Sequence, residues 1–504
     1  MLNFIDRFLD GITMYRLVLY YLIVVLIVAL GLSTVRILPF SPVAILFSTL
    51  FILLVCYVSN KIFSYVFKAP TNTESFYITA LILALIITPS VNIHAVPFLG
   101  FASVLAMSSK YILAIGKKHV FNPAAIAVAL CAYGLGQSAS WWVGTAWMMP
   151  VVIIGGILIV RKIQRVELVL SFFIVALLAS FFTNTAGTAL FEITKRVMLD
   201  SSLFFLGFVM LTEPLTTPPT KKGQIFYGVL TGLLFPPQMH IGSIYSTPEL
   251  ALLVGNVISY LISPKVKLLL LLSDKIKSTS DIIEFIFPLK KRFKFKPGQY
   301  MEWTLPHKGV DARGNRRYFT IASSPTEDAL RLGVKFYENG SSFKRALQGL
   351  AEGSEIVAAQ PAGEFTLPEN KNQKLVFIAG GIGITPYRSI IKYLVDSNEK
   401  RDIIVMYSNK TASEIMYEDI FSAAEKLGIK TVYTLTDVDS IPENWKGKIG
   451  RIDSKMISDV IPDYMQRKFY LSGPHMMVNG FENTLREMNI PSKQIKIDFF
   501  PGFV

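Results

Sequence analysis

The chain has 504 residues, more than one ordinary domain holds, and 52% of them are hydrophobic. Its formal net charge of +14 at pH 7 largely flanks apolar segments, so membrane topology explains it better than nucleic-acid binding does. Two cysteines, Cys56 and Cys131, exclude a disulfide framework and a Cys-ligated zinc or iron–sulfur site built by this chain alone, and we predict no metal site.

Residues 1–263 contain long apolar runs such as "LVLYYLIVVLIVALGL", which approach or reach the roughly 20 residues that cross a hydrocarbon core. The sequence therefore predicts a polytopic α-helical membrane domain with about ten crossings. The predicted crossings are 16–38, 43–66, 75–89, 97–115, 122–136, 141–160, 167–183, 198–212, 224–239 and 248–263.

Basic residues are distributed unevenly between the loops that join these runs. If the N-terminus is cytoplasmic, most loop Lys and Arg residues face the cytoplasm, and Arg36, Lys195 and Arg196 face outward. This bias predicts a multi-pass protein of the cell membrane with both termini in the cytoplasm. It also places the stretch "TNTAGTALFEIT", residues 183–194, on the outer side.

Proline interrupts two short apolar runs, one in each half of the predicted bundle. The run 122–136 opens with "FNPAA", and the run 198–212 leads into "TEPLTTPPT". Irregular backbone at membrane depth lines a cavity or is buried, so we predict a site here with Asn122 and Thr212 as cofactor-binding candidates. The alternative is that the prolines only end helices.

From about residue 266 the apolar segments become short and alternate with polar residues, as in a domain that folds in water. "KFKPGQYMEWTLP" and "RRYFTIASSP" read as strands, and Arg317, Phe319 and Thr320 offer a cation, an aromatic ring and a hydroxyl to a planar anionic cofactor. "ENGSSFKRALQGLAEG" is a Gly-Ser turn before a helical run, where backbone N–H groups can bind phosphate.

The stretch "KLVFIAGGIGITPYRSIIKYL" reads as a buried strand, a glycine turn and an amphipathic helix. Gly380, Gly381 and Gly383 allow a dinucleotide to approach the backbone, with its phosphates at the helix N-terminus. "DIIVMYSN" and "RKFYLSGP" are further strands that end in polar turns, as in a parallel α/β sheet.

Residues 266–504 resemble the ferredoxin–NADP reductase-like flavoproteins. "RYFTIAS" is similar to their FAD motif, "GGIGITP" to their pyridine-dinucleotide loop and "SGPHMM" to their C-G-P-x-x-M motif. The resemblance implies an antiparallel β-barrel FAD domain at 266–370 and a parallel α/β NAD(P) domain at 371–504. It implies that FAD is held by Arg317, Phe319 and Thr320, with Ser341 and Ser342 near the pyrophosphate and Phe503 of the "DFFPGF" tail near the flavin.

The same resemblance assigns the nicotinamide side of the site. NAD(P)H would meet Gly380, Gly381, Gly383, Thr385, Gly473 and Pro474, and the catalytic candidates are Thr320 and Ser472. Ser472 stands where many members have cysteine beside the nicotinamide. The choice between NADH and NADPH stays open, because Lys410 can either meet a 2′-phosphate or lie solvated.

Residues 1–263 resemble the NqrB-type membrane protein of the sodium-translocating NADH:quinone reductase and the RnfD-type membrane protein of the Rnf complex, through "SSKYILAIGKKHVFNPAA" and "FLGFVMLTEPLTTPPTKKGQIFYG". The resemblance implies a membrane-domain flavin, FMN or riboflavin. In those proteins FMN is joined to a threonine in a motif close to D-x-x-S-G-A-T, and "TAGT" makes Thr188 the attachment position. Here Ala186 and Gly187 are exchanged and Phe182 replaces the aspartate, so covalent and noncovalent binding both remain open.

Together these features predict an enzyme that oxidises cytoplasmic NAD(P)H through FAD and passes electrons by a membrane flavin to a quinone or an extracytoplasmic acceptor. Its partners would be NAD(P)H, that acceptor and membrane lipid, with no nucleic acid. One alternative is redox-driven Na⁺ or H⁺ translocation, for which Glu213 is the main candidate. The other is a haem enzyme, which His94, His119 and His240 support poorly because no two lie along one crossing.

Overall fold

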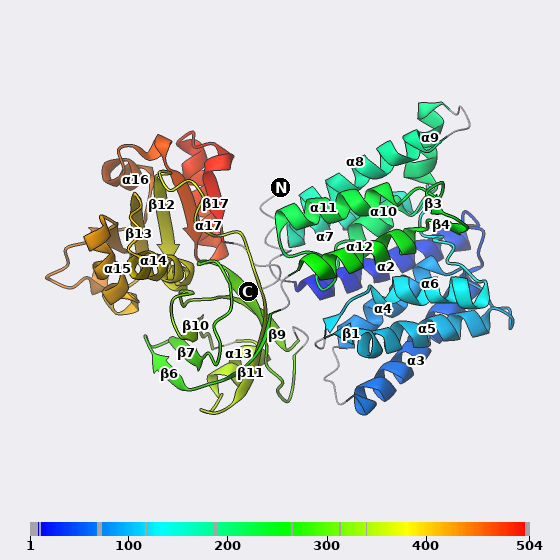
Figure 1. Cartoon of the computed structure of the whole chain (residues 1–504), viewed down its shortest axis with the longest axis horizontal. Coiled ribbons are helices and arrows are strands. Elements are labelled where there is room, and N and C mark those ends of the chain that lie inside the picture. The colour runs from blue at the N-terminus through cyan, green and yellow to red at the C-terminus, as the bar shows by residue number, and fades with distance from the viewer. Residues whose placement is uncertain are drawn as a thin grey trace. The chain divides into compact units, whose positions relative to one another are not determined.

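The computed structural model describes most of the chain, namely residues 9, 12–67, 73–115, 118–184, 189–263, 266–311, 314–338 and 340–498. The chain divides into two compact units, with the boundary directly after Ser263. Figure 1 shows that helices form the first unit, whereas sheets with helices around them form the second.

Helices account for nearly all the secondary structure described in the first unit. Two small hairpins join them, β1 (Ala114–Ile115) with β2 (Lys118–His119) and β3 (His240–Ile241) with β4 (Ile244–Tyr245). The helices are α2 (Met14–Thr34), α3 (Pro42–Val66), α4 (Thr73–Ile86), α5 (Val96–Ile112), α6 (Pro123–Leu135), α7 (Met149–Ile163), α8 (Val166–Phe182), α9 (Leu190–Leu199), α10 (Leu203–Phe205), the π-helical η1 (Leu206–Met210), α11 (Lys221–Leu233) and α12 (Pro248–Ile262).

Several of these helices begin where a polar side chain caps the first turn. Thr13 accepts a hydrogen bond from the backbone of Arg16, and Asn122 accepts two, from Ala124 and Ala125. The proline that follows Asn122 occupies a first-turn position whose N–H would have no helical partner. The prolines at residues 42, 123 and 248 therefore start helices, so the alternative that Pro123 only ends a helix is wrong.

Each predicted apolar run contains a helix, although the bounds differ. The run 141–160 becomes helical only at Met149, and the run 198–212 is divided among the end of α9, α10 and η1. The hydroxyl of Ser201 explains this break, because it bonds the carbonyl of Val197 and accepts from the N–H of Leu203, which ends one helix and starts another. Helix α9 was not among the predicted elements.

Within the described residues, α2 and α3 are long and apolar enough to cross a membrane, and α5, α8 and α12 are shorter apolar helices. Large apolar side chains also point outward from the first unit: Ile27, Leu50 and Leu54 are 61%, 63% and 61% exposed. Contiguous apolar surface of this kind is unfavourable in water.

The first part of the second unit consists of two antiparallel sheets around one apolar core. The sheets have the orders β10–β7–β6 and β5–β11–β8–β9, and their inner side chains include the fully buried Trp303, Phe285 and Phe287. Their elements are β5 (Lys267–Leu271), β6 (Asp274–Lys277), β7 (Ile282–Pro288), β8 (Tyr300–Thr304), β9 (Arg316–Thr320), β10 (Ala329–Lys335), helix α13 (Ser342–Gln348) and β11 (Glu355–Ala362).

The second part is a six-stranded parallel sheet in the order β15–β14–β13–β12–β16–β17. Every residue of the central strand β12 is buried, because apolar cores cover both faces of the sheet. The elements are β12 (Leu375–Gly380), η2 (Gly381–Ile384), α14 (Thr385–Ser397), β13 (Ile403–Asn409), η3 (Ala412–Glu414), α15 (Glu418–Ala424), η4 (Glu425–Leu427), β14 (Lys430–Leu435), η5 (Val438–Ser440), β15 (Lys448–Ile449), α16 (Ser454–Val460), η6 (Tyr464–Gln466), β16 (Lys468–Ser472), α17 (His475–Glu487), η7 (Ser492–Gln494) and β17 (Ile495–Ile497).

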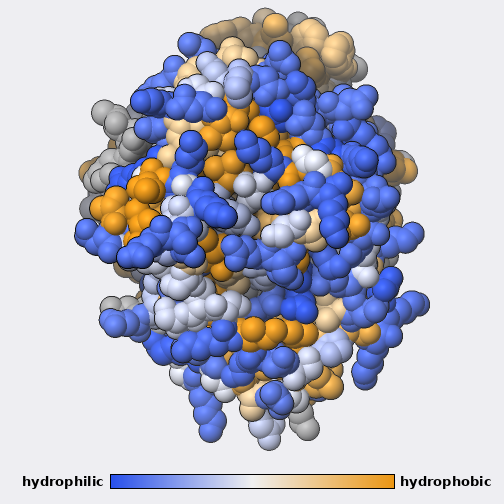
Figure 2. All heavy atoms as spheres, turned by 90° about the vertical axis from the view of Figure 1, so that its left-hand side faces the viewer, coloured by the Kyte–Doolittle hydropathy of each residue, from blue (hydrophilic) through white to orange (hydrophobic). Residues whose placement is uncertain are grey.

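The surface of the second unit differs from that of the first. Figure 2 views the side on which the second unit lies, and most side chains there are hydrophilic, with small apolar areas between them. The antiparallel and the parallel sheet both agree with the predicted fold class.

Candidate functional site

The glycine loop follows the central strand of the parallel sheet, at its carboxyl end. β12 runs beside β16 with Ala379 opposite Ser472, so the loops after the two strands lie together. A Cβ atom built on Gly383 would overlap the carbonyl oxygen of Ser472, so only glycine fits there. Gly381 has φ of +50°, with open space where its side chain would be. The backbone at Gly381 is therefore not covered by neighbouring atoms at this point.

The start of helix α14 completes this loop. Thr385 is buried, and its hydroxyl donates to the carbonyl of Ile382 at 3.1 Å, which closes the turn between η2 and the helix. The first N–H groups of a helix carry partial positive charge, so this end suits the phosphates of a dinucleotide. The strand, turn and helix predicted from the sequence are therefore confirmed as structure.

Ser472 ends β16, and Gly473 and Pro474 follow it; the three residues lie against the glycine loop. A Cβ atom on Gly380 would overlap the sulfur of Met477 and lie 3.5 Å from Pro474, so the two segments are closely packed. The buried hydroxyl of Ser472 donates to the carboxylate of Asp498 at 2.9 Å. Burial raises the pKa of the Asp498 carboxyl to about 7, although the hydrogen bond from Ser472 acts in the opposite direction.

Asp498 was not among the predicted site residues. The sequence contained a signal, because Asp498 is the acidic residue of the "DFFPGF" ending that was singled out for its aromatic residues. Phe503 of the same ending lies outside the described residues.

Arg317, Phe319 and Thr320 lie on β9, in the antiparallel part. Arg317 is buried, its guanidinium lies 5.4 Å from the ring centre of Phe343, and Nη1 donates to the carbonyls of Gly314 and Arg316 at 3.2 and 2.6 Å. The ring of Phe319 also packs near Phe343, at 6.0 Å between ring centres. A cation and aromatic rings thus share one region, as a planar anionic cofactor requires.

Ser341 and Ser342 start helix α13, next to the same arginine. Ser341 caps the helix by accepting from the N–H of Lys344. The hydroxyl of Ser342 accepts from the N–H of Asp311 at 2.9 Å and lies 3.0 Å from Nε2 of His307. Asp311 in turn approaches Arg317, at 4.0 Å between Oδ1 and Nη2. Asp311 thus links Arg317 with Ser342, and His307 bonds Ser342. The sequence analysis had not singled out Asp311 or His307.

Asn122 and Thr212 of the first unit both line one cavity. The amide of Asn122 donates to Oε2 of Glu213 at 2.9 Å, and its backbone N–H donates to the buried Asn256 at 2.8 Å. The remaining lining is mainly apolar and comes from α2, α4, α6, α7 and η1, including Met14, Val18, Ile78, Ile159 and Val209. Polar groups thus converge in a mainly apolar cavity, a combination that is typical of small-molecule sites.

Asn256 and the neighbouring Tyr227 also escaped the sequence reading. Asn256 donates to the hydroxyl of Tyr227 at 2.8 Å, and both side chains are fully buried. In the sequence, each is a polar residue inside an apolar run. This pattern by itself does not distinguish a binding-site residue from a buried residue whose hydrogen bonds are made within the core. Thr188, the predicted attachment position, lies outside the described residues.

Three family models match the chain in succession. The model described as "NQR2, RnfD, RnfE family" matches residues 132–267, "Oxidoreductase FAD-binding domain" matches 269–367, and "Oxidoreductase NAD-binding domain" matches 377–483.

Curated relatives are reductases or flavohemoproteins. The chain is 28% identical over 218 residues to the glycine betaine monooxygenase reductase subunit of Chromohalobacter salexigens, covering 42% of this chain and 58% of that protein. It is 28% identical to the reductase component of propane 2-monooxygenase of Mycolicibacterium goodii, covering 42% of this chain and 60% of that protein. The chain therefore spans less than two thirds of the length of these relatives.

Two solved structures show weaker similarity over less than half of the chain. A cytochrome P450 reductase from Amycolatopsis is 22% identical with a TM-score of 0.42, covering 47% of this chain and 71% of that one. A ferredoxin NADP⁺ reductase from Neisseria gonorrhoeae is 18% identical with a TM-score of 0.40, covering 46% and 97%. On the three successive family matches, this chain is an NQR2/RnfD/RnfE-family segment fused to the FAD-binding and NAD-binding domains of an NAD(P)H-dependent oxidoreductase.

Proposed function

We propose that this protein carries electrons from cytoplasmic NAD(P)H across the cell membrane to a quinone or an extracytoplasmic acceptor. The observation that carries the proposal is the fusion itself, because one chain joins an NQR2/RnfD/RnfE-family segment to FAD-binding and NAD-binding domains. The proposed parts are a membrane domain at 1–263 with about ten crossings, an FAD-binding β-barrel at 266–370 and an NAD(P)-binding domain at 371–504. The uneven loop charge supports cytoplasmic termini.

In the second unit, the residues around β9 and α13 hold FAD. Arg317 meets the pyrophosphate together with Ser341 and Ser342, and the burial of its guanidinium beside Phe343 supports this role. Phe319 and Thr320 meet the isoalloxazine, which Phe503 would cover.

NAD(P)H lies on the loops after β12 and β16, against Gly380, Gly381, Gly383, Thr385, Gly473 and Pro474. When both cofactors are bound, they supply the chemistry, a hydride transfer that oxidises the dihydronicotinamide and reduces the flavin. Ser472 orients the nicotinamide, and Asp498 holds the Ser472 hydroxyl through the 2.9 Å hydrogen bond.

A second flavin, FMN or riboflavin, binds noncovalently in the cavity of the first unit. The amide of Asn122 and the groups of Thr212 and Glu213 would meet its polar edge, and the polar groups that converge in this mainly apolar cavity support the placement. The alternative is FMN joined to Thr188, and the two differ in whether flavin remains with the denatured polypeptide.

Ion translocation is a second candidate function. Glu213 lines the cavity and bonds Asn122, so an acidic group lies where electrons would pass. Sodium or proton flux into proteoliposomes during NADH oxidation would support coupling, and electron transfer without flux would contradict it.

The full chain purified in detergent provides the main test. We expect FAD and a second flavin to be released on denaturation, and NADH or NADPH to reduce ferricyanide as an artificial acceptor. A preparation without any flavin, or one that oxidises neither nucleotide, would contradict the proposal.

A further inference from the structure

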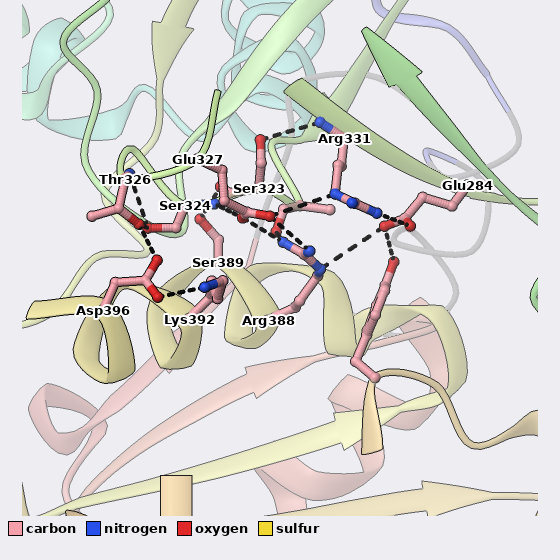
Figure 3. A network of polar contacts seen from close by, with 12 residues as sticks. Glu284, Ser323, Ser324, Thr326, Glu327, Arg331, Arg388, Ser389, Lys392 and Asp396 are labelled. Atoms are coloured by element: carbon pink, nitrogen blue, oxygen red, sulfur yellow. Dashed lines mark hydrogen bonds and ion pairs between the residues drawn. The ribbon is translucent and has the colours of Figure 1, made fainter. Parts of the chain in front are cut away.

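Arg388 ties helix α14 to the antiparallel part of the second unit. Its side chain is buried, and Nη1 and Nη2 donate to the two carboxylate oxygens of Glu327 at 2.8 and 3.0 Å. Nη1 also donates to the carbonyl of Ala322 at 2.9 Å. Both partners come from the segment between β9 and β10, and Figure 3 shows the paired arrangement. A planar guanidinium that meets a carboxylate through two bonds fixes orientation as well as distance.

Glu284 of β7 contacts Arg331, Tyr417 and Arg388, and we call this group of side chains and Glu327 the cluster. Glu284 is 3% exposed, and it accepts from Nη1 of Arg331 at 2.7 Å and from the hydroxyl of Tyr417 at 3.0 Å. Arg388 approaches the same carboxylate at 3.9 Å and lies 5.2 Å from the ring centre of Tyr417. Tyr417 belongs to the parallel-sheet part and precedes α15, so the cluster joins both parts of the unit from several elements.

The cluster balances its charges, since Glu284 and Glu327 face Arg331 and Arg388. Burial acts to raise the pKa of Glu327, but the hydrogen bonds and charge of Arg388, the N–H of Ser324 and the charge of Arg331 together outweigh it and hold that pKa below its ordinary value. Removing two charge pairs from water is costly, and a well-packed apolar contact would often be as stable. What the ion network adds is one defined arrangement of the two parts.

This arrangement places the nucleotide loop. Arg388 follows Thr385 by one turn of α14, so it is anchored directly behind the loop Gly381–Ile384. A Cβ atom on Gly333 of β10 would lie 3.0 Å from Cγ2 of Thr385 and 3.2 Å from the Tyr417 hydroxyl. Strand β10 of the antiparallel part therefore packs against both the nucleotide loop and the cluster. A second contact, from the Ser389 hydroxyl to the carbonyl of Ser323 at 2.7 Å, lies beside Arg388 on the same helix.

We propose that Arg388, Glu284 and Tyr417 form a positioning cluster that sets the nucleotide loop relative to the FAD-binding part for hydride transfer. The proposal rests on the NAD(P)H-to-FAD reaction of the proposed function and adds three residues that need not touch either cofactor. Small displacements of reacting groups have large effects on rate, because the reaction requires close and aligned atoms. Each cofactor binds to the residues on its own side of the site. A change in the cluster therefore affects cofactor binding less than it affects the rate of hydride transfer.

The test uses Tyr417→Phe and Arg388→Lys in the full chain, with Arg467→Lys as the matched control. Arg467 is also a buried arginine held by two carboxylates, Asp402 and Asp463, but all three lie within the parallel-sheet part. Anaerobic stopped-flow mixing with NADH, or with NADPH if wild type prefers it, measures the rate of flavin reduction and the nucleotide dissociation constant. FAD content and hydrogen–deuterium exchange of residues 381–390 without nucleotide provide readouts that do not depend on turnover.

We expect both cluster variants to lower the flavin-reduction rate about 10- to 100-fold, with FAD content and nucleotide affinity within about twofold of wild type. Exchange in residues 381–390 should become faster. An unchanged rate in Tyr417→Phe and in Arg388→Lys would overturn the inference, as would an equal loss in Arg467→Lys. If Arg388→Lys fails to fold, Tyr417→Phe decides alone, because it removes one hydroxyl. A wild-type protein whose FAD is not reduced would instead contradict the proposed function.

Discussion

At the scale of single residues, two neighbouring arginines on β9 differ in how deeply they are buried. Arg316 and Arg317 are neighbours, but Arg316 is exposed and faces Glu302 at 3.5 Å, whereas Arg317 is 6% exposed beside Phe343. Alternation along a strand sends the two side chains to opposite faces. The motif alone led the sequence analysis to choose Arg317 over Arg316, since both residues carry the same charge.

Arg317→Ala should therefore weaken FAD binding. Loss of one charge-assisted contact to a pyrophosphate costs about 1.5–3 kcal/mol, which corresponds to about a 10- to 150-fold rise in the FAD dissociation constant. FAD content after gel filtration measures the effect. Arg316→Ala is the control and should retain FAD; equal FAD content in the two variants would show that the pyrophosphate lies elsewhere.

Asp498 gives the second prediction at this scale. Its folded-state pKa of about 7 lies above the ordinary value of 3.8, so the folded protein holds a proton that the unfolded chain releases. The stability that Asp498 contributes is complete below pH about 4 and is lost as the pH rises through about 7. Asp498→Asn keeps the site neutral and should therefore become more stable relative to wild type as the pH rises from 5 to 8, by a few kcal/mol at most.

The midpoint of thermal unfolding of the detergent-solubilised chain at several pH values measures this difference. Asp463→Asn is the control, because hydrogen bonds from Arg467 lower the pKa of Asp463 to about 2. Its contribution is present throughout pH 5–8 and is lost only as the pH falls toward about 2, so its difference from wild type should stay constant. A pH-independent difference for Asp498→Asn would contradict an uncharged Asp498.

At the scale of elements, the π-helical η1 and the residues after it mark the cavity of the first unit. π-Helical turns interrupt α-helices mostly at functional sites, and Thr212 and Glu213 follow η1 closely. The sequence predicted one continuous run over 198–212, because hydrophobicity does not distinguish α-helical from π-helical turns. Proline after Glu213 was the available signal of irregular backbone.

Gly207 shows how closely η1 packs. A Cβ atom at Gly207 would lie 2.5 Å from Phe173 and 3.0 Å from Phe172, so Gly207→Ala should lower stability by about 1–3 kcal/mol. Gly31→Ala in α2 is the control, because no atom lies within 4 Å of the new methyl group. We expect it to be neutral or to raise stability by up to about 1 kcal/mol. Thermal unfolding compares the two, and similar midpoints would contradict the packing of η1.

At the scale of the whole molecule, the chain consists of two units with opposite surfaces. The first exposes large apolar side chains along its helices, whereas the face of the second unit drawn in Figure 2 is mainly hydrophilic. Opposite surfaces suit lipid and water respectively, which is the physical basis for proposing a membrane part and a cytoplasmic part.

Cysteine labelling tests the proposed topology. Cys56 and Cys131 are buried, so the native background of labelling should be low. Lys195→Cys and Lys222→Cys each place a thiol at an exposed position. In intact cells, a membrane-impermeant maleimide should label Lys195→Cys, and it should label Lys222→Cys only after permeabilisation. The reverse pattern, or labelling of both from outside, would contradict cytoplasmic termini.

The sequence alone determined the local elements and the order of the domains. The apolar runs, the strands around Arg317 and the strand–turn–helix at Gly380–Thr385 follow from periodicity and turn residues, which act over short stretches of chain. Motif resemblance added the cofactors. These are properties that neighbouring residues determine among themselves.

Only the tertiary structure decided which distant side chains meet. Ser472 bonds Asp498 because β16 and β17 are paired, and Gly383 touches Ser472 because β12 and β16 are neighbours in the sheet. Arg388 approaches Glu284, although the two residues are 104 positions apart in the sequence and belong to different parts of the second unit. Strand order and packing result from the burial of the whole apolar core, so no local pattern around these residues indicates their partners.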